Sequence, residues 1–224
     1  MTSSIALRIS TIRQHLPASV QLIAVTKQVS VAAMREAYAA GVRDFGESRV
    51  QEAASKQAQL QDLRDITWHF IGSLQSNKAK KALEQFQWIH SLDNLELAQR
   101  LDRLSSQMGL MPQVCLQVKL LSDSNKSGWT VPELLTDLNE LSQCQSLQIR
   151  GLMTIPPLGL SESEIFNVFE STRELAAKIQ QLSLPQIQMQ QLSMGMSDDY
   201  HLAIRAGATM VRLGRILFGE RPAP

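Results

Sequence analysis

The sequence predicts an α/β fold: a single closed (β/α)8 barrel of the TIM type with an extra N-terminal helix, in one domain over residues 1–224. Short apolar runs alternate with amphipathic patterns of helical spacing along the whole chain. The runs start roughly 20 to 40 residues apart, about the length that one βα unit requires. A chain of 224 residues, 44% of them hydrophobic, is long enough to bury one large core.

Strict alternation with eight strands has two main solutions, a closed barrel and an open doubly wound sheet. The open sheet usually has a glycine-rich turn after its first strand. Here the first apolar run leads into the sequence AVTKQVS, which contains no glycine. No linker, low-complexity stretch or change of composition marks a second domain, so the sequence favours the barrel.

The elements follow from the pattern in chain order. Ile5, Ile9, Ile12 and Leu16 recur at helical spacing between arginines, which predicts a helix and makes this segment too polar for a secretory signal. The predicted strands come next, at Leu22–Thr26, Val42–Phe45, Thr67–Ile71, Trp88–Ser91, Val114–Val118, Ile149–Ile155, Gln188–Leu192 and Thr209–Leu213.

Three of the intervening helices have recognisable ends. Asn94 is a typical N-cap, and the helix that follows it carries a leucine-rich face and is closed by Gly109. Two others begin with a capping box, in which an N-cap Ser or Thr is followed three residues later by Glu. These boxes are Thr130 with Glu133, and Ser161 with Glu164.

The charge balance excludes several functional classes. Twenty-two Lys and Arg against twenty-one Asp and Glu give a net charge of +1, whereas a nucleic-acid-binding protein usually has a basic excess. No apolar run approaches the roughly 20 residues that a membrane span needs. Cys115 and Cys144 lie far apart without metal-binding spacing, which is typical of buried thiols in a reducing compartment. We expect a cytoplasmic protein that binds no nucleic acid, membrane or metal.

The candidate chemistry begins with Lys27, which directly follows the first predicted strand. Functional residues of β/α barrels lie at the carboxyl ends of the strands. A lysine partly removed from water there has a lowered pKa, which frees the amine as a nucleophile toward carbonyl groups. The alternative is a lysine that simply reaches solvent past the end of the strand.

The ends of the last two strands predict a phosphate site. Ser193 offers a hydroxyl in the sequence Ser-Met-Gly, where the glycine allows close approach of a ligand to the backbone. Gly214 and Arg215 open a short segment whose free N–H groups resemble a helix N-terminus. A nucleophilic lysine opposite a phosphate site suits pyridoxal 5′-phosphate (PLP) and suits equally a Schiff-base aldolase that acts on sugar phosphates. The residues alone leave both open.

Six segments between Ile23 and Arg221 carry a specific combination of motifs: IAVTK, DFGESRVQE, WHFIGSLQSNK, GLMTIPP, LSMGMSDD and VRLGRILFGER. In this combination and order the chain resembles the pyridoxal phosphate homeostasis protein family. The resemblance implies a barrel similar to the N-terminal domain of alanine racemase, without that enzyme's second domain. It also implies that PLP is bound.

By position, the resemblance makes Lys27 the residue that holds PLP covalently as a Schiff base. It assigns the phosphate to Ser193 and to the backbone around Gly214 and Arg215, and it places Arg212 opposite the pyridine nitrogen. A guanidinium there disfavours protonation of the ring and makes it a poor electron sink. From the residues alone, Arg212 can instead pair with an acid such as Glu47 or Asp198.

One position departs from the family pattern. The family more often shows Asn where this chain has Ser48, and a hydroxyl is shorter than an amide and has one donor instead of two. We therefore expect any contact that the family makes through that amide to differ in this chain.

The resemblance implies a monomeric protein that holds or delivers PLP and regulates vitamin B6 and amino-acid homeostasis, with PLP-dependent apo-enzymes as partners. The alternative is a PLP-dependent amino-acid racemase or decarboxylase, which needs a second acid–base group on the opposite face of the ring. The sugar-phosphate aldolase remains a third interpretation.

Overall fold

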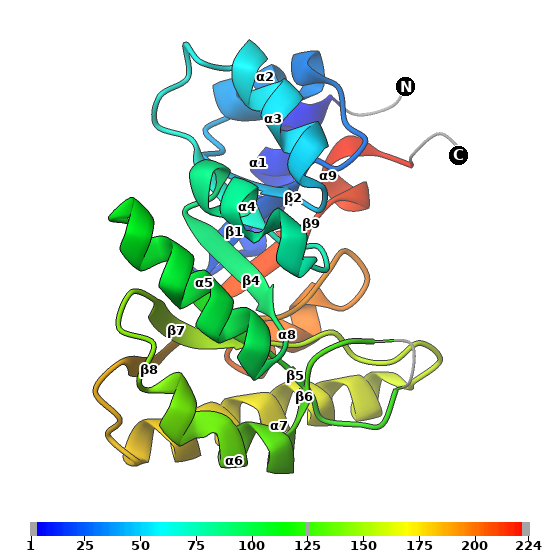
Figure 1. The fold of residues 1–224 in the computed structure, drawn as a ribbon. Helices are drawn as coiled ribbons and strands as arrows, with labels where there is room; N and C mark the ends of the chain where they lie inside the picture. Colours follow the sequence, from blue (N-terminus) through cyan, green and yellow to red (C-terminus); the bar gives the residue numbers. More distant parts are fainter. Residues whose placement is uncertain (1–3, 124–125, 221–224) are drawn as a thin grey trace.

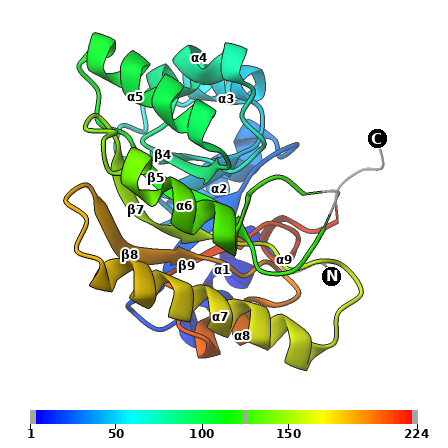
Figure 2. The same cartoon turned by 60° about the horizontal axis from the view of Figure 1, so that its bottom comes forward.

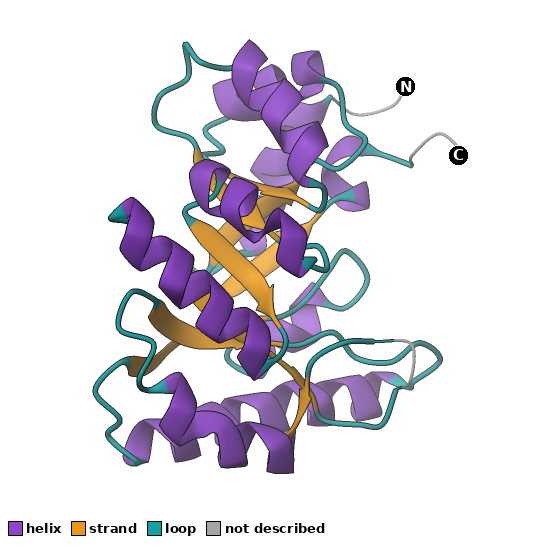
Figure 3. Cartoon of the chain, viewed as in Figure 1, coloured by secondary structure: helices purple, strands orange, loops and turns teal. Residues whose placement is uncertain are grey.

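The computed structural model describes residues 4–123 and 126–220; the rest of the predicted domain lies outside the described residues. Within this part of the chain, eight parallel strands close into a barrel, with helices on the outside (Figures 1 and 3). The strands pair in the order β1-β2-β3-β4-β5-β7-β8-β9, and β9 pairs with β1. They are Gln21–Val25 (β1), Asp44–Glu47 (β2), Thr67–Phe70 (β3), Trp88–Leu92 (β4), Gln113–Lys119 (β5), Gln148–Met153 (β7), Ile187–Ser193 (β8) and Met210–Leu213 (β9). The predicted fold class is confirmed.

The helices cover the barrel from outside; Figure 2 shows α7 along β8, against which it packs. The predicted N-terminal helix is α1, which contacts α2 and α9. No helix of the described residues is both long enough and apolar enough to cross a membrane. The helices are Ile5–His15 (α1), Val31–Ala39 (α2), Val50–Gln59 (α3), Ala79–Gln85 (α4), Leu95–Met108 (α5), Val131–Leu141 (α6), Glu162–Gln181 (α7), Tyr200–Arg205 (α8) and Arg215–Phe218 (α9), with a 3₁₀ turn at Ser76–Lys78.

The predicted helix ends are confirmed. Asn94 accepts a hydrogen bond from Leu97 N–H at the start of α5, and Gly109 closes this helix with a φ of 65°. Both capping boxes are formed, at the starts of α6 and α7. Local sequence therefore determines these boundaries, because each cap satisfies backbone groups that the helix itself leaves unpaired.

Two apolar clusters form the core. The larger lies between the barrel wall and the helices. The smaller is contributed by strands from all round the barrel, so it fills the barrel interior. Its buried members are Ile23, Trp88, Cys115, Met153 and Met210.

One strand prediction needs correction, and one short strand was not predicted. The second strand is Asp44–Glu47 instead of Val42–Phe45, because Val42 N–H still bonds the carbonyl of Ala37 in the turn after α2. This shift places Glu47 inside the sheet. A short strand that the sequence does not indicate, Trp129–Thr130 (β6), pairs with the end of β5. Two residues are too few to show a strand period.

Candidate functional site

Lys27 lies two residues past the end of β1, at the mouth of the barrel, the end at which the strands finish. It is half-buried, in a turn closed by a hydrogen bond of 2.9 Å from Val29 N–H to the Thr26 carbonyl. Gln28, the next residue, has a φ of 61°, in the left-handed region that L-residues disfavour. Its N–H donates to Glu52 Oε1 at 2.6 Å. Contacts from outside the turn therefore hold this conformation.

A buried cluster of charged side chains holds the residues on both sides of Lys27. Lys56, on α3, donates to the Thr26 carbonyl at 2.6 Å and to Glu52 Oε1 at 2.6 Å. Its third bond goes to Glu47 Oε1 at 2.8 Å, which uses the last of the three ammonium donors. The Thr26 hydroxyl donates to the same Glu47 oxygen at 2.6 Å. The side chains of Lys56 and Glu47 are 8% and 0% exposed, so these bonds form almost without competing water.

The second carboxylate oxygen of Glu47, Oε2, is buried and has no hydrogen-bond partner among the described residues. Burial raises the pKa of the Glu47 carboxyl, while hydrogen bonds from Lys56 and Thr26 oppose the rise. A buried acceptor without a donor is costly and is typical of a place that a water molecule or ligand completes.

The loops after β8 and β9 leave backbone N–H groups without a protein acceptor. Among the hydrogen bonds of the described residues, none is donated by the N–H of Ser197, Gly214 or Arg215. Ile216 N–H donates to Ser197 Oγ at 3.4 Å, which brings the two loops together. Gly214 is the N-cap residue of α9. Clustered N–H groups of this kind bind anions such as phosphate.

The side chains of these loops are engaged with one another. The Arg215 guanidinium pairs with the Asp198 carboxylate, and both are substantially exposed. Gly195 has a φ of 95°, and a Cβ built there would lie 2.6 Å from the Cβ of Ala203. The loop therefore requires glycine at this position, and the backbone is what it offers to a ligand.

Arg212 is buried and bound to the ends of two neighbouring strands. Its NH1 group donates to the Ser193 carbonyl at 2.6 Å and to Ser193 Oγ at 2.7 Å, and NH2 donates to the Thr154 carbonyl at 3.1 Å. Burial lowers the pKa of the guanidinium to about 10. Three of its five N–H donors are used in these bonds. Neither of the acids considered as partners from the sequence binds it: Glu47 pairs with Lys56, and Asp198 with Arg215.

Ser193 is the last residue of β8 and is fully buried. Its Oγ lies 2.7 Å from His90 Nδ1 as well as 2.7 Å from Arg212 NH1. The Ser193 oxygen accepts from the guanidinium, and its hydroxyl proton is available to a neutral imidazole that is unprotonated at Nδ1. The Ser193 side chain therefore points into the barrel and is bound to His90 and Arg212, which differs from the expected phosphate contact.

The barrel brings the predicted residues onto three neighbouring strands. β8, β9 and β1 are adjacent, and the register pairs Ala24 of β1 with Leu213 of β9. Lys27 thus follows β1 at the same end of the barrel at which Gly214 follows β9. Sequence reasoning missed Lys56 and His90, and it considered Glu47 only as a partner of Arg212, whereas Glu47 pairs with Lys56. The available signal was polar side chains within otherwise apolar strand and helix faces.

Ser48 directly follows β2, half-buried, and lines a depression of about 320 Å3 together with Lys78. A Cβ on Gly72 would lie 2.2 Å from the Ser48 carbonyl oxygen, so the loops after β2 and β3 touch. Tyr200, the first residue of α8, lines a depression of about 370 Å3 with Leu7 and Thr11 of α1, on the outside of the barrel.

The chain matches the family described as alanine racemase, N-terminal domain, over residues 2–222. Alanine racemase from Clostridium difficile 630 has the same fold, with a TM-score of 0.79 at 14% identity. The match covers 98% of this chain and 57% of that enzyme.

More similar relatives match over most of their length. A pyridoxal phosphate homeostasis protein of Synechocystis sp. is 54% identical over 206 residues, 92% of this chain and 94% of the relative, and that of Escherichia coli K12 is 39% identical over 208 residues, 92% of this chain and 87% of the relative. The structure of PipY from Synechococcus elongatus with PLP bound superposes with a TM-score of 0.92 at 55% identity, covering 96% of this chain and 100% of PipY. As the resemblance of its motifs predicts, the chain belongs to the pyridoxal phosphate homeostasis protein family.

Proposed function

We propose that this protein binds PLP covalently through Lys27 and holds or delivers it, in the regulation of vitamin B6 and amino-acid homeostasis. The observation that carries the proposal is the 55% identity to PipY, whose structure contains PLP, over 96% of this chain. The names of the relatives support the homeostasis role.

The residues at the mouth fit such a ligand. Bound PLP supplies an aldehyde, a phosphate and an aromatic ring. Lys56, Glu47 and Glu52, which we call the Lys56 cluster, hold the turn that carries Lys27. The amine is therefore positioned by the residues on both sides of it. The free N–H groups of Gly214 and Arg215 hold the phosphate, and Arg212 faces the ring with the donors that its protein contacts leave unused.

We further propose that the protein has no enzymatic turnover, and that it acts as a cytoplasmic monomer which passes PLP to PLP-dependent apo-enzymes. A guanidinium beside the ring nitrogen disfavours the charge delocalisation on which most PLP enzymes depend. The ring of Tyr200 lines a depression on the outside of the barrel, away from the place where a second acid–base group is needed.

The test is chemical labelling of the lysine. Borohydride reduction of the PLP-loaded protein, followed by peptide mapping, should place the pyridoxyl group on Lys27, and Lys27→Ala should lose the visible absorption band of bound PLP. Lys78→Ala is the matched control, because Lys78 lines the mouth from another loop and should leave band and label unchanged. A pyridoxyl group on Lys78 or Lys126 would refute the assignment.

A further inference from the structure

An unbroken line of hydrogen bonds runs through the barrel from its amino-terminal end to its mouth. His69 Nε2 lies 3.0 Å from Asp44 Oδ1, and His69 Nδ1 lies 2.9 Å from His90 Nε2. His90 Nδ1 lies 2.7 Å from Ser193 Oγ, which in turn accepts from Arg212 at 2.7 Å. We call these five residues the polar line. It crosses the barrel from β2 through β3 and β4 to β8 and β9.

The inner members of the polar line are removed from solvent. His69, His90 and Ser193 are 0% exposed, and Arg212 is 4% exposed. Both nitrogens of each imidazole have a partner, so the buried polar groups are satisfied. Apolar groups of the same shape in place of both partners of a buried hydrogen bond are often neutral for stability or increase it. Stability alone therefore does not account for this arrangement.

The two ends of the line fix the position of every proton along it. With both rings neutral, Asp44 only accepts and Arg212 only donates, so each ring is protonated at Nε2 and the hydroxyl proton of Ser193 goes to His90 Nδ1. The Nε2–H of His90 then goes to His69 Nδ1, and the Nε2–H of His69 goes to Asp44. Both rings are neutral in this order. Burial lowers the pKa of His69 and that of His90, which agrees with two uncharged imidazoles.

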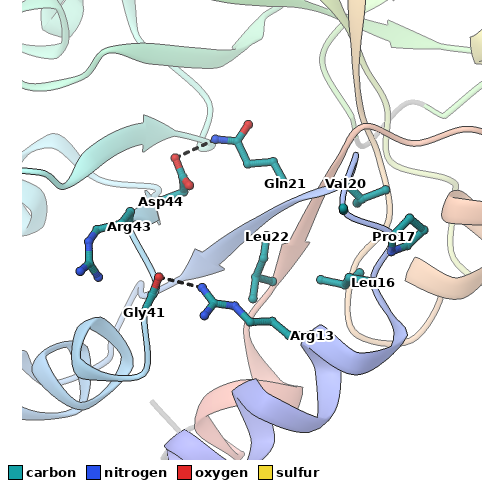
Figure 4. Close-up of a pocket in the computed structure, with 10 residues that line it drawn as sticks. Arg13, Leu16, Pro17, Val20, Gln21, Leu22, Gly41, Arg43 and Asp44 are labelled. Atoms are coloured by element: carbon teal, nitrogen blue, oxygen red, sulfur yellow. Dashed lines mark hydrogen bonds between the residues drawn. The ribbon is translucent and has the colours of Figure 1, made fainter.

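The far end of the line is open to solvent. Asp44 has a side chain that is 19% exposed and lines a depression of about 490 Å3 at the amino-terminal end of the barrel (Figure 4). Its Oδ1 atom also accepts from Gln21 Nε2 at 2.8 Å. Asp44 is thus anchored on β1 and β2, while Arg212 lies at the ends of β8 and β9.

We infer that Asp44, His69 and His90 are positioning residues for Arg212. The line directs the Ser193 proton away from Arg212, so that the Ser193 oxygen accepts from the guanidinium and holds it with its remaining donors free. An interruption of the line removes the acceptor that fixes the Ser193 side chain, so that the Ser193 oxygen can move away from NH1 and Arg212 loses one of its three bonds. The inference rests on the proposed function in one respect, that Arg212 faces bound PLP.

The first test uses the full chain without PLP. Nitrogen-15 NMR of the histidine rings should show His69 and His90 as neutral Nε2–H tautomers that do not titrate between about pH 5 and 8, the range in which exposed histidines change charge. A titrating ring or an Nδ1–H tautomer at either position would overturn the polar line, whatever the protein binds.

The second test uses the PLP-loaded protein. Asp44→Asn and His90→Gln should shift the visible band of PLP and weaken its binding by about twofold to thirtyfold, the range of couplings through such networks. His15→Gln should do neither. If Arg212→Gln alters the band and the other two variants do not, positioning through the line is refuted and the role of Arg212 stands. If Arg212→Gln also leaves the band unaltered, its proposed place beside the ring fails, and the inference fails with it.

Discussion

The ammonium group of Lys56 donates a hydrogen bond of 2.6 Å to the main-chain carbonyl of Thr26, the residue immediately before Lys27. A buried charge from α3 thereby fixes the backbone of the turn that presents the candidate nucleophile. The same ammonium also binds Glu52, which accepts the N–H of Gln28 on the other side of Lys27. The turn is thus held from both ends by one cluster.

Lys56→Met should destabilise the protein by about 3–5 kcal/mol, because it leaves the buried carboxylate of Glu47 without a counter-charge. Urea unfolding of the protein without PLP measures this change. The control is Arg35→Met, which removes an exposed ion pair with Asp62 and should change stability little. Adding Glu47→Gln to Lys56→Met should recover part of the loss, and no recovery would contradict the pairing.

Acid should destabilise the protein as the pH falls below 6.5, the ordinary histidine pKa. Burial lowers the native pKa of His69 and of His90, so below that pH the unfolded chain binds protons that the native protein does not. Stability is therefore full above pH 6.5 and falls by up to about 1.4 kcal/mol per pH unit for each histidine below it.

Unfolding curves at several pH values check this slope, and His90→Gln should reduce it. Burial raises the native pKa of Glu47, so this residue changes stability with pH in the direction opposite to the histidines. Because the unaltered protein and His90→Gln both contain Glu47, its contribution cancels in the difference between their two slopes. Equal slopes in the two proteins would show that His90 is charged or exposed in solution.

Gly214→Val should weaken PLP binding by about tenfold or more, equal to about 1.4 kcal/mol, because a branched side chain blocks the approach of an anion to the backbone. Fluorimetric titration with PLP measures the dissociation constant. Gly109→Asn is the matched control, since this glycine ends α5 and an added Cβ meets nothing within 4 Å there. An unchanged constant for Gly214→Val would place the phosphate elsewhere.

The PLP-loaded protein should show little or no racemase or decarboxylase turnover. Racemisation needs an acid on one face of the reacting carbon and a base on the other. Lys27 can serve one face, and the ring of Tyr200 lines a depression against α1 outside the barrel. Incubation with L- and D-amino acids in deuterated water, followed by NMR, measures exchange of the α-proton. Rapid exchange that Lys27→Ala abolishes would favour the enzyme.

The sequence by itself determined the elements and their order. Apolar runs and capping residues such as Asn94 and Ser161 are local signals, because the groups that they satisfy lie within a few residues. The same signals identified Lys27 and Gly214 as residues that follow the ends of strands. They misplaced β2 by two residues, since the pattern could not show that Val42 still belongs to the preceding turn.

Only the tertiary structure decided which polar groups meet. Closing the barrel pairs Ala24 with Leu213 and brings His90 within 2.7 Å of Ser193, residues that stand far apart in the sequence. Such contacts depend on the register of all the strands and on which faces turn inward, and packing of the whole core sets both. The Lys56 cluster and the polar line are products of that closure, whereas the barrel topology and the position of Lys27 are properties of the sequence itself.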